Sequence, residues 1–170
     1  MNAIGYTGGK PLNDPDAFVQ FEQETPNPSG RDLLVEVRAI SVNPVDTKVR
    51  EKTSEPQNPP LILGWDAAGK VISVGPEAEL FKPGDKVFYA GSIDRPGSNS
   101  SLQLVDERIV GSMPKTLSFE EAAALPLTSI TAWEALFDRL QIPKNNSGKS
   151  ILVLGGAGGV GSIAIQLANK

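Results

Sequence analysis

The stretch SILVLGGAGGVG, Ser150 to Gly161, decides the fold that this sequence predicts. Four consecutive apolar residues, Ile151 to Leu154, lead into a glycine-rich loop. The residues SIAIQLANK that follow have the apolar spacing of a helix that begins near Val160. A strand that is apolar at every position is typical of a parallel sheet covered on both faces. The stretch therefore predicts a strand, a glycine turn and a helix.

The glycines of this loop follow a spacing that suits a dinucleotide. Gly156, Gly158 and Gly161 fit G-x-G-x-x-G, which provides a tight turn, a backbone without Cβ near a pyrophosphate, and close helix packing. The free N–H groups and the positive dipole end of the helix would face the phosphates. The backbone of Gly156, Gly158, Gly159, Val160 and Gly161 is the predicted cofactor site, and an ordinary glycine loop is the alternative.

The composition excludes several classes of function. Of the 170 residues, 39% are hydrophobic and 21% are charged, which is ordinary for a globular protein with a core. A net charge of -4 argues against nucleic acid or an anionic membrane as partner. No segment has the roughly 20 apolar residues of a membrane span, and the N-terminus lacks the apolar core of a signal peptide. The expected location is cytoplasmic.

The sequence has neither cysteine nor histidine. It therefore excludes disulfides, thiolate nucleophiles, imidazole bases and zinc sites made of these residues. Any chemistry must use a bound cofactor, carboxylates, amides, hydroxyls, lysine or arginine.

The first part of the chain has the features of a β-barrel or sandwich. Short apolar stretches are separated by proline and glycine. Residues 33–39 alternate in the manner of a half-buried strand, and the polar segment Gly91 to Ser101 is expected to be a mobile loop. The predicted strands are Asn2 to Tyr6, Phe18 to Glu22, Leu33 to Ile40, Gly69 to Val74, Lys86 to Ala90 and Leu102 to Val110.

Two helices are predicted after Pro114. Ser118 and Glu121 have the spacing of a capping box, so a helix should start at Phe119. Pro126 should interrupt it and bias Leu125 toward extended geometry. The apolar face of the second helix is expected in the core and consists of Leu127, Ile130, Trp133, Phe137 and Leu140.

The sequence ends at Lys170, shortly after the glycines. A strand–helix–strand unit needs about 30 residues, and the residue that reads the ribose lies about 20 residues past the glycines. NAD and NADP are therefore not distinguished. The chain is expected to be a fragment, inactive by itself, whose strand edges are exposed or paired with another copy.

Five stretches in order resemble the medium-chain dehydrogenase/reductase superfamily. They are SVNPVDTKVR at 41–50, LGWDAAGKVISVG at 63–75, FKPGDKVFYAG at 81–91, AAALPLTSITAWEAL at 122–136 and SILVLGGAGGVGSIAIQLA at 150–168. The branch they resemble is quinone-oxidoreductase-like, near the bacterial zinc-type alcohol dehydrogenase-like proteins. The resemblance implies an α/β fold with a β-rich part. A GroES-like β-barrel domain would occupy residues 1–118. Linking helices and the first strand, glycine turn and helix of an incomplete Rossmann domain, truncated at the C-terminus, would occupy residues 119–170.

The resemblance also implies that the catalytic zinc is missing. Zinc-dependent members have Cys, His and Cys at the positions of Asn43, Trp65 and Leu127, and none of these three suits zinc. The cysteine-rich lobe for structural zinc is absent as well. No metal site is expected.

The activity implied by the resemblance is an NAD(P)H-dependent reduction of quinones or α,β-unsaturated carbonyls by hydride transfer from nicotinamide C4. NADPH is the expected cofactor, with NADH as the alternative, and the full-length protein is expected to be a homodimer. Two other functions remain open: a zinc-type alcohol dehydrogenase and a non-catalytic GroES-like binding or scaffold module.

Three residues are implied as catalytic. Asn43 and Asp46 would lie at the nicotinamide end, and Lys48 would donate to the oxyanion. A turn at Asn43, a helix N-terminal charge at Asp46 and a solvated face for Lys48 and Arg50 are the structural alternatives.

Further residues are implied at the cofactor and the substrate. Thr128 and Thr131 would approach the nicotinamide, or else bond a carbonyl one turn back. Trp65 and Tyr89 would line the substrate cleft, or else pack in the core. Asp66 is expected to support the fold at the GWDAAG turn.

Overall fold

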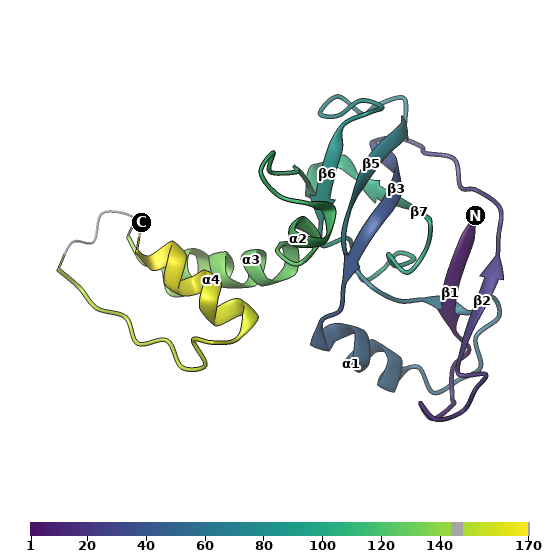
Figure 1. Ribbon diagram of the computed structural model, residues 1–170, viewed down its shortest axis with the longest axis horizontal. Helices are drawn as coiled ribbons and strands as arrows, with labels where there is room; N and C mark the ends of the chain where they lie inside the picture. The colour runs from purple at the N-terminus through teal and green to yellow at the C-terminus, as the bar shows by residue number, and fades with distance from the viewer. Residues whose placement is uncertain (144–147, 170) are drawn as a thin grey trace. The chain divides into compact units, whose positions relative to one another are not determined.

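The structure is a computed structural model that describes residues 1–143 and 148–169 (Figure 1). The chain divides into unit 1, Met1–Ala124, and unit 2, Leu125–Lys170. Helix α2 (Phe119–Ala123) belongs to unit 1, whereas the predicted boundary after residue 118 places it in the second part. The reason is its packing, because Ala122 and Ala123 are buried against Ala68 of the sheet.

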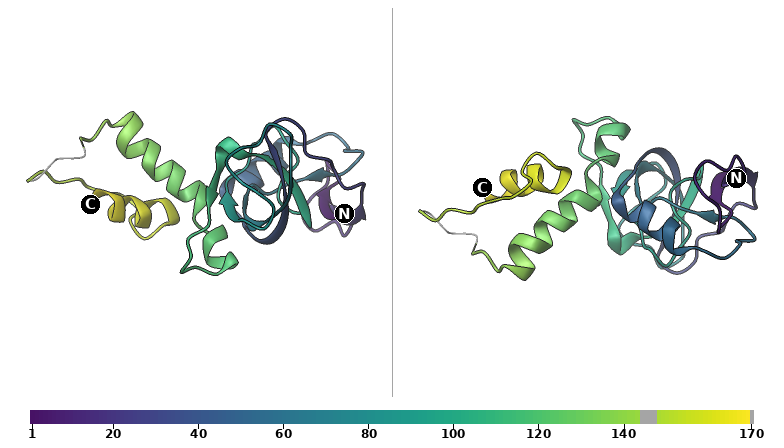
Figure 2. Two further views of the ribbon diagram at one scale, coloured as in Figure 1. Left: turned by 90° about the horizontal axis from the view of Figure 1, so that it is seen from above. Right: turned by 90° about the horizontal axis from the view of Figure 1, so that it is seen from below.

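Unit 1 consists of two antiparallel sheets, which Figure 2 shows from above and from below. The three-stranded sheet has the order β2 (Phe18–Glu22), β1 (Asn2–Tyr6) and β4 (Leu61–Ile62). The five-stranded sheet has the order β7 (Leu102–Asp106), β3 (Asp32–Ser41), β5 (Asp66–Val74), β6 (Lys86–Tyr89) and β8 (Val110–Ser112).

The predicted strands are found in these sheets, with three differences. Strand β4 is not among the predicted strands. Strand β5 begins at Asp66, before the predicted start at Gly69. The predicted strand Leu102 to Val110 is split by the 3-10 turn Glu107–Ile109.

The pairing of β3 with β5 holds the main core of unit 1. The register extends from Leu33 opposite Val74 to Ser41 opposite Asp66, with two irregularities along it. Leu33 and Val35 are completely buried on the core face, as the alternation predicts, while Leu34 on the opposite face is buried too. The core cluster around this pair comprises Leu33, Val35, Ala67, Val71, Val87, Tyr89 and Val105.

The loop Gly91 to Ser101 is held in place, so the prediction of a mobile loop is wrong. The N–H groups of Gly97, Ser98 and Asn99 donate to the carbonyls of residues 62–64 at 2.9, 2.6 and 3.0 Å. The polar composition suggested a loop that bonds to water, but these N–H groups form hydrogen bonds with the backbone carbonyls of another segment.

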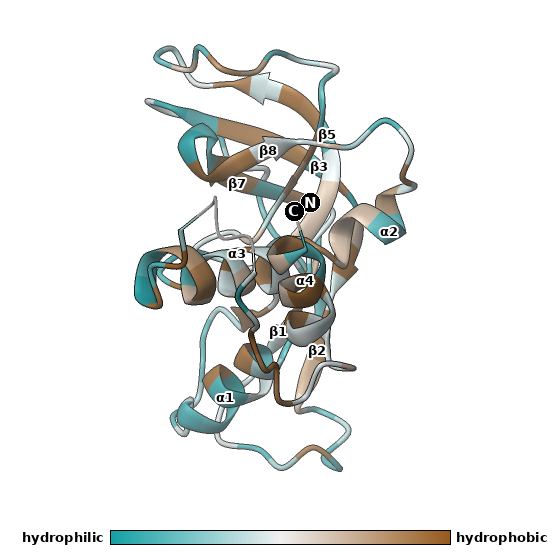
Figure 3. Cartoon of the chain, turned by 90° about the vertical axis from the view of Figure 1, so that its left-hand side faces the viewer, coloured by the Kyte–Doolittle hydropathy of each residue, from teal (hydrophilic) through white to brown (hydrophobic). Residues whose placement is uncertain are grey.

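Unit 2 contains α3 (Pro126–Trp133), a π-helical continuation η2 (Glu134–Arg139) and α4 (Gly159–Ala168). Its core is formed by Ala132, Leu136 and Ala164. Figure 3 shows hydrophobic residues along α3 and α4. In the parts of the chain that the structure describes, every helix is too short or too polar to span a bilayer.

The predicted apolar face of α3 is not the buried one. Ile130 and Trp133 are each 45% exposed, and Trp133 contacts the half-buried Phe137 in a tilted arrangement, with ring centroids 4.6 Å apart and ring planes at 57°. Small Ala132 faces α4 instead, because a short side chain lets two helices approach closely.

The segment Ile151 to Leu154 is not a strand. Leu152 and Leu154 are exposed, and no strand pairs with this segment among the described residues. A β-strand exists only within a ladder of backbone hydrogen bonds. Apolar composition alone therefore does not produce one.

Leu125 is helical, with φ -98° and ψ -36°, and not extended as predicted. Pro126 occupies the first turn of α3, where its missing N–H costs no hydrogen bond. The carbonyl of Leu125 accepts the N–H of Ser129 at 2.9 Å, which offsets the steric bias against αR before proline. The predicted start of α2 at Phe119 and its capping box from Ser118 are confirmed.

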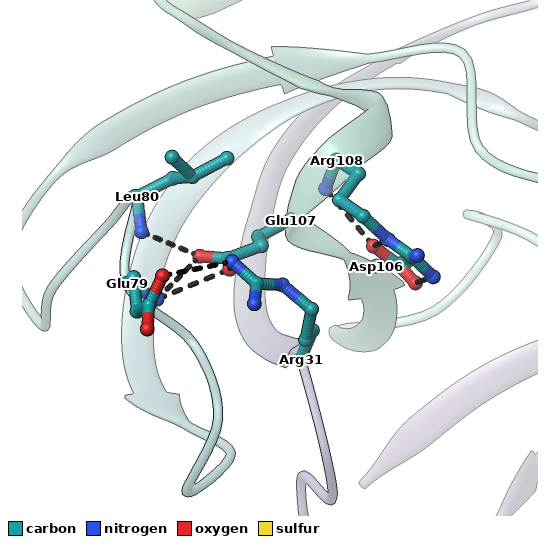
Figure 4. A network of polar contacts seen from close by, with 6 residues as sticks. All are labelled: Arg31, Glu79, Leu80, Asp106, Glu107 and Arg108. Atoms are coloured by element: carbon teal, nitrogen blue, oxygen red, sulfur yellow. Dashed lines mark hydrogen bonds and ion pairs between the residues drawn. The ribbon is translucent and has the colours of Figure 1, made fainter.

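A buried carboxylate ties three loops of unit 1 together (Figure 4). Glu107 accepts the N–H groups of Glu79 and Leu80, the latter at 2.7 Å, and pairs with Arg31 at 2.7 Å. Burial alone would raise the pKa of Glu107, but these N–H groups and the guanidinium outweigh it and hold the pKa below its ordinary value. The neighbouring Asp106 accepts hydrogen bonds from the guanidinium group and from the backbone N–H of Arg108. These bonds likewise lower the pKa of Asp106.

Leu33→Ala tests the importance of the β3–β5 core. The free energy of unfolding should fall by about 2 to 5 kcal/mol, because the variant loses buried methyl groups and leaves a cavity. Urea denaturation followed by circular dichroism measures it. Leu12→Ala is the matched control, since Leu12 is exposed and its change should stay within about 0.5 kcal/mol. Equal losses for both variants would contradict the assigned core.

Glu107→Gln tests the buried carboxylate. A carboxyl whose pKa is lowered by folding contributes stability above its unfolded pKa, near about 4.3, and loses it as the pH falls through the folded pKa. The variant should be less stable at neutral pH and should lose less stability on acidification between about pH 5 and pH 3. Glu51→Gln, at an exposed site, is the control. A difference from the wild type that is the same at every pH would refute the lowered pKa.

Candidate functional site

Two of the candidate catalytic residues lie at the N-terminus of helix α1 (Pro44–Lys52). Asn43 is the N-cap and forms a capping box with Asp46, in which the side chain of each faces the N–H of the other. The N–H of Asn43 donates to Asp46 Oδ2 at 2.6 Å. Asp46 is therefore a helix-terminal charge, which is the structural role weighed for it.

The side chain of Asn43 reaches across to strand β5. Its Nδ2 donates to Asp66 Oδ2 at 2.8 Å. Asp66 is 0% exposed, and Asn43 and Asp46 are each 9% exposed. Asn43 thus donates to two buried carboxylates, through its backbone N–H to Asp46 and through its side-chain amide to Asp66, and these hydrogen bonds offset part of the desolvation of the carboxylates.

Lys48 and Arg50 follow on the same helix and have different surroundings. Lys48 is exposed. Arg50 lies over the ring of Tyr6, 5.8 Å from its centroid, and pairs with Glu51 at 3.8 Å. Of these two cations, Lys48 is the one whose charge is open to solvent.

Trp65 and Tyr89 are core side chains of unit 1. Trp65 is 5% exposed, packs with Tyr6 and Leu63, and donates its Nε1–H to the carbonyl of Ser92 at 3.0 Å. Tyr89 donates its hydroxyl to Gln103 Oε1 at 3.0 Å, and burial raises the pKa of Tyr89. A substrate-lining role for Trp65 and Tyr89 stays a prediction.

The glycine turn of unit 2 bends one residue earlier than predicted. Gly155, and not Gly156, has the left-handed φ of +70°, and its carbonyl accepts the N–H of Gly158 at 2.9 Å. A Cβ on Gly161 would lie 2.4 Å from the Gly155 carbonyl oxygen. Gly161 is therefore required for the close approach of α4 to the turn.

The N-terminus of α4 has no side-chain cap. Its N-cap is Gly158, which has no side chain, and the first intrahelical bond runs from Ser162 N–H to the Gly158 carbonyl at 2.9 Å. The N–H groups of the first turn have no intrahelical acceptors, and the helix dipole makes this end positive. The turn can accept an anionic group such as a pyrophosphate.

The two candidate threonines are on α3. Thr128 Oγ1 donates to the Leu125 carbonyl at 3.0 Å, and Thr131 Oγ1 donates to the Leu127 carbonyl at 2.7 Å. A Cβ on Gly159 would lie 3.0 Å from Thr128 Cγ2, so Thr128 adjoins the glycine turn. Contact of either threonine with a cofactor stays a prediction.

The residues at the expected zinc positions do not suit zinc. Leu127 has no donor atom, the indole of Trp65 presents an N–H donor, and the Asn43 amide is bonded to Asp66. Within residues 1–143 and 148–169, no group of three or more Asp, Glu, His or Cys side chains is arranged to hold a metal ion.

Residues 29–129 match the alcohol dehydrogenase GroES-like domain family. The chain belongs to this family. The predicted membership of the medium-chain dehydrogenase/reductase superfamily, and its GroES-like fold, are thereby confirmed.

Relatives and solved structures agree with this assignment. A zinc-type alcohol dehydrogenase-like protein of Staphylococcus aureus is 50% identical over 173 residues, covering 100% of the chain and 51% of the relative. A putative zinc-dependent alcohol dehydrogenase from Rhizobium etli is 56% identical with a TM-score of 0.89, covering 99% of the chain and 49% of that structure. Escherichia coli quinone oxidoreductase, solved in complex with NADPH, is 31% identical with a TM-score of 0.80, covering 99% and 49%. The chain spans about half the length of the curated relatives it matches.

Sequence reasoning missed one member of the site in this GroES-like domain. Asp66 was expected to support a turn, but its carboxylate binds Asn43, 23 residues earlier. The pairing of β3 with β5 produces this contact, because Ser41 lies opposite Asp66 and Asn43 follows Ser41 by two residues.

Gly161→Ala tests the close packing at the glycine turn. Hydrogen exchange of the α4 amides should show a loss of local stability of about 1 to 3 kcal/mol, since the added methyl meets backbone. Gly156→Ala is the matched control, because its methyl would meet the end of the flexible Ile165 side chain at 3.0 Å and the Val153 carbonyl oxygen at an ordinary contact distance of 3.7 Å. Equal protection of α4 in both variants would contradict the assignment.

Proposed function

We propose that the intact protein is a zinc-independent, NADPH-dependent reductase of quinones or α,β-unsaturated carbonyls. The observation that carries the proposal is the turn at Gly155 and Gly158 in front of α4, whose first-turn N–H groups lack a side-chain cap. The names of the relatives support the class of reaction, since a quinone-oxidoreductase homolog from Spinacia oleracea is 36% identical over 176 residues. A 2-methylene-furan-3-one reductase from Solanum lycopersicum is 44% identical over 144 residues.

The residues of the glycine turn fit a dinucleotide. Gly161 allows α4 to approach the turn, Gly156, Gly158 and Gly159 present backbone without side chains, and Val160 contributes a backbone N–H of the first turn of α4. These five residues would hold the pyrophosphate, and Thr128, which adjoins Gly159, would lie beside it. Thr131 is one turn further along α3 and would take part through its hydroxyl.

NADPH, when bound, supplies a hydride from nicotinamide C4. The protein must then provide a hydrogen bond and a proton to the oxygen on which negative charge develops. Asn43 offers an amide N–H, and Lys48 offers an exposed ammonium group for this purpose. Asp46 would act through the helix terminus, by fixing the backbone of Asn43.

Trp65 and Tyr89 would shape the substrate cleft from behind, since both are buried. A small-molecule quinone, enone or enal is the proposed substrate, and a homodimer is the proposed assembly. Alcohol oxidation with zinc is suggested by the relatives' names, but the residues at positions 43, 65 and 127 provide no thiolate or imidazole ligand.

Val160→Asp tests the proposed phosphate site. A carboxylate in the first turn of α4 suits the helix dipole but repels a pyrophosphate. Fluorescence titration of the intact protein with NADPH should show a Kd raised about 10- to 100-fold, while the protein stays folded. Gln166→Glu adds the same charge near the other end of α4 and should change the Kd by no more than about twofold.

The wild-type protein must also oxidise NADPH in the presence of a benzoquinone or a conjugated enone. If the intact wild type neither changes the fluorescence of NADPH nor oxidises NADPH, the proposed function is wrong. Equal weakening by Val160→Asp and Gln166→Glu would refute the phosphate site.

A further inference from the structure

The Asn43 side-chain amide is oriented by a buried carboxylate. The N–H of Asp46 donates to the backbone carbonyl of Asn43 at 3.0 Å, so the helix end does not use the side-chain amide. The amide nitrogen donates to the Asp66 carboxylate at 2.8 Å. A carboxylate can only accept, so Asp66 excludes the flipped orientation of the amide.

This arrangement leaves one hydrogen of the amide. Asn43 Nδ2 carries two hydrogens, and Asp66 takes one of them. Within the described residues, the second is in no hydrogen bond. An amide polarised by a buried carboxylate is a stronger donor through its remaining N–H, because hydrogen bonds in a chain reinforce one another.

Asp66 is itself held rigidly. It is 0% exposed, begins strand β5, and lies opposite Ser41 of β3. Ser98 Oγ donates to the backbone carbonyl of Asp66 at 3.3 Å, which links Asp66 to the loop Gly91 to Ser101. The position of the carboxylate is therefore set by the sheet and not by the helix that carries Asn43.

We propose that Asp66 is a positioning residue that fixes the Asn43 amide with one N–H directed at the reacting carbonyl oxygen of the substrate. The inference rests on the proposed reductase function. In it, the side-chain amide of Asn43 is the hydrogen-bond donor of that reaction, and Asp66 holds this amide in the orientation that the reaction needs.

The test exchanges the two side chains in the intact protein. Asp66→Asn alone should lower kcat about 10- to 100-fold with the Kd for NADPH unchanged, since the amide can then flip. The double variant Asn43→Asp with Asp66→Asn keeps the net charge, the N-cap and the hydrogen bond, but turns the donor away from the substrate. It should regain the Tm of the wild type and not its kcat.

Two outcomes would overturn the inference. If the double variant regains both Tm and kcat, the pair is only an anchor for α1. If Asp66→Asn leaves kcat unchanged, the amide needs no positioning.

A second measurement uses the wild type and needs no variant to fold. In the NMR spectrum, one side-chain Nδ2 proton of Asn43 should be shifted downfield by Asp66. The other should move when NADPH and a non-reducible phenolic analogue of the quinol are added together. If neither proton moves while NADPH and the analogue bind, the inference fails and the proposed function stands. If NADPH does not bind, the proposed function fails and the inference with it.

Discussion

The antiparallel pairing of β3 with β5 is the constraint on which unit 1 depends. One end of the pair buries Leu33 against the core, and the other places Ser41 opposite Asp66. Because Asn43 follows Ser41 by two residues and is the N-cap of α1, the same register brings its side-chain amide to Asp66. A shift by one residue would turn each side chain to the other face and remove both the core and the polar pair.

Buried charge in unit 1 follows one rule at two places. Glu107 is satisfied by backbone N–H groups and Arg31, and Asp66 is satisfied in part by the Asn43 amide. Hydrogen bonds from segments distant in sequence offset the desolvation of each carboxylate, and these bonds hold the segments together. The difference is chemical. The donors to Glu107 form hydrogen bonds within the fold. Asn43, in the proposed function, would use its second Nδ2 hydrogen to donate to the substrate.

Local patterns in the sequence predicted most strands and the start of α2, because alternation and capping depend on neighbouring residues. They also predicted the glycine turn, although the bend falls at Gly155. Features that depend on distant partners were missed. Trp133 is exposed because Ala132 faces α4, the loop Gly91 to Ser101 is bonded to residues 62–64, and Ile151 to Leu154 has no described ladder to join. The contact of Asp66 with Asn43 also depends on a partner distant in sequence.

In the proposed reaction, a hydrogen-bond donor at Asn43, and no metal ion, stabilises the developing negative charge. The most direct measurement is the rate of NADPH oxidation with a benzoquinone before and after prolonged dialysis of the intact protein against a strong zinc chelator. The account predicts the same rate after dialysis and no increase on adding zinc. Loss of activity on dialysis, with recovery when one equivalent of zinc is returned, would contradict it.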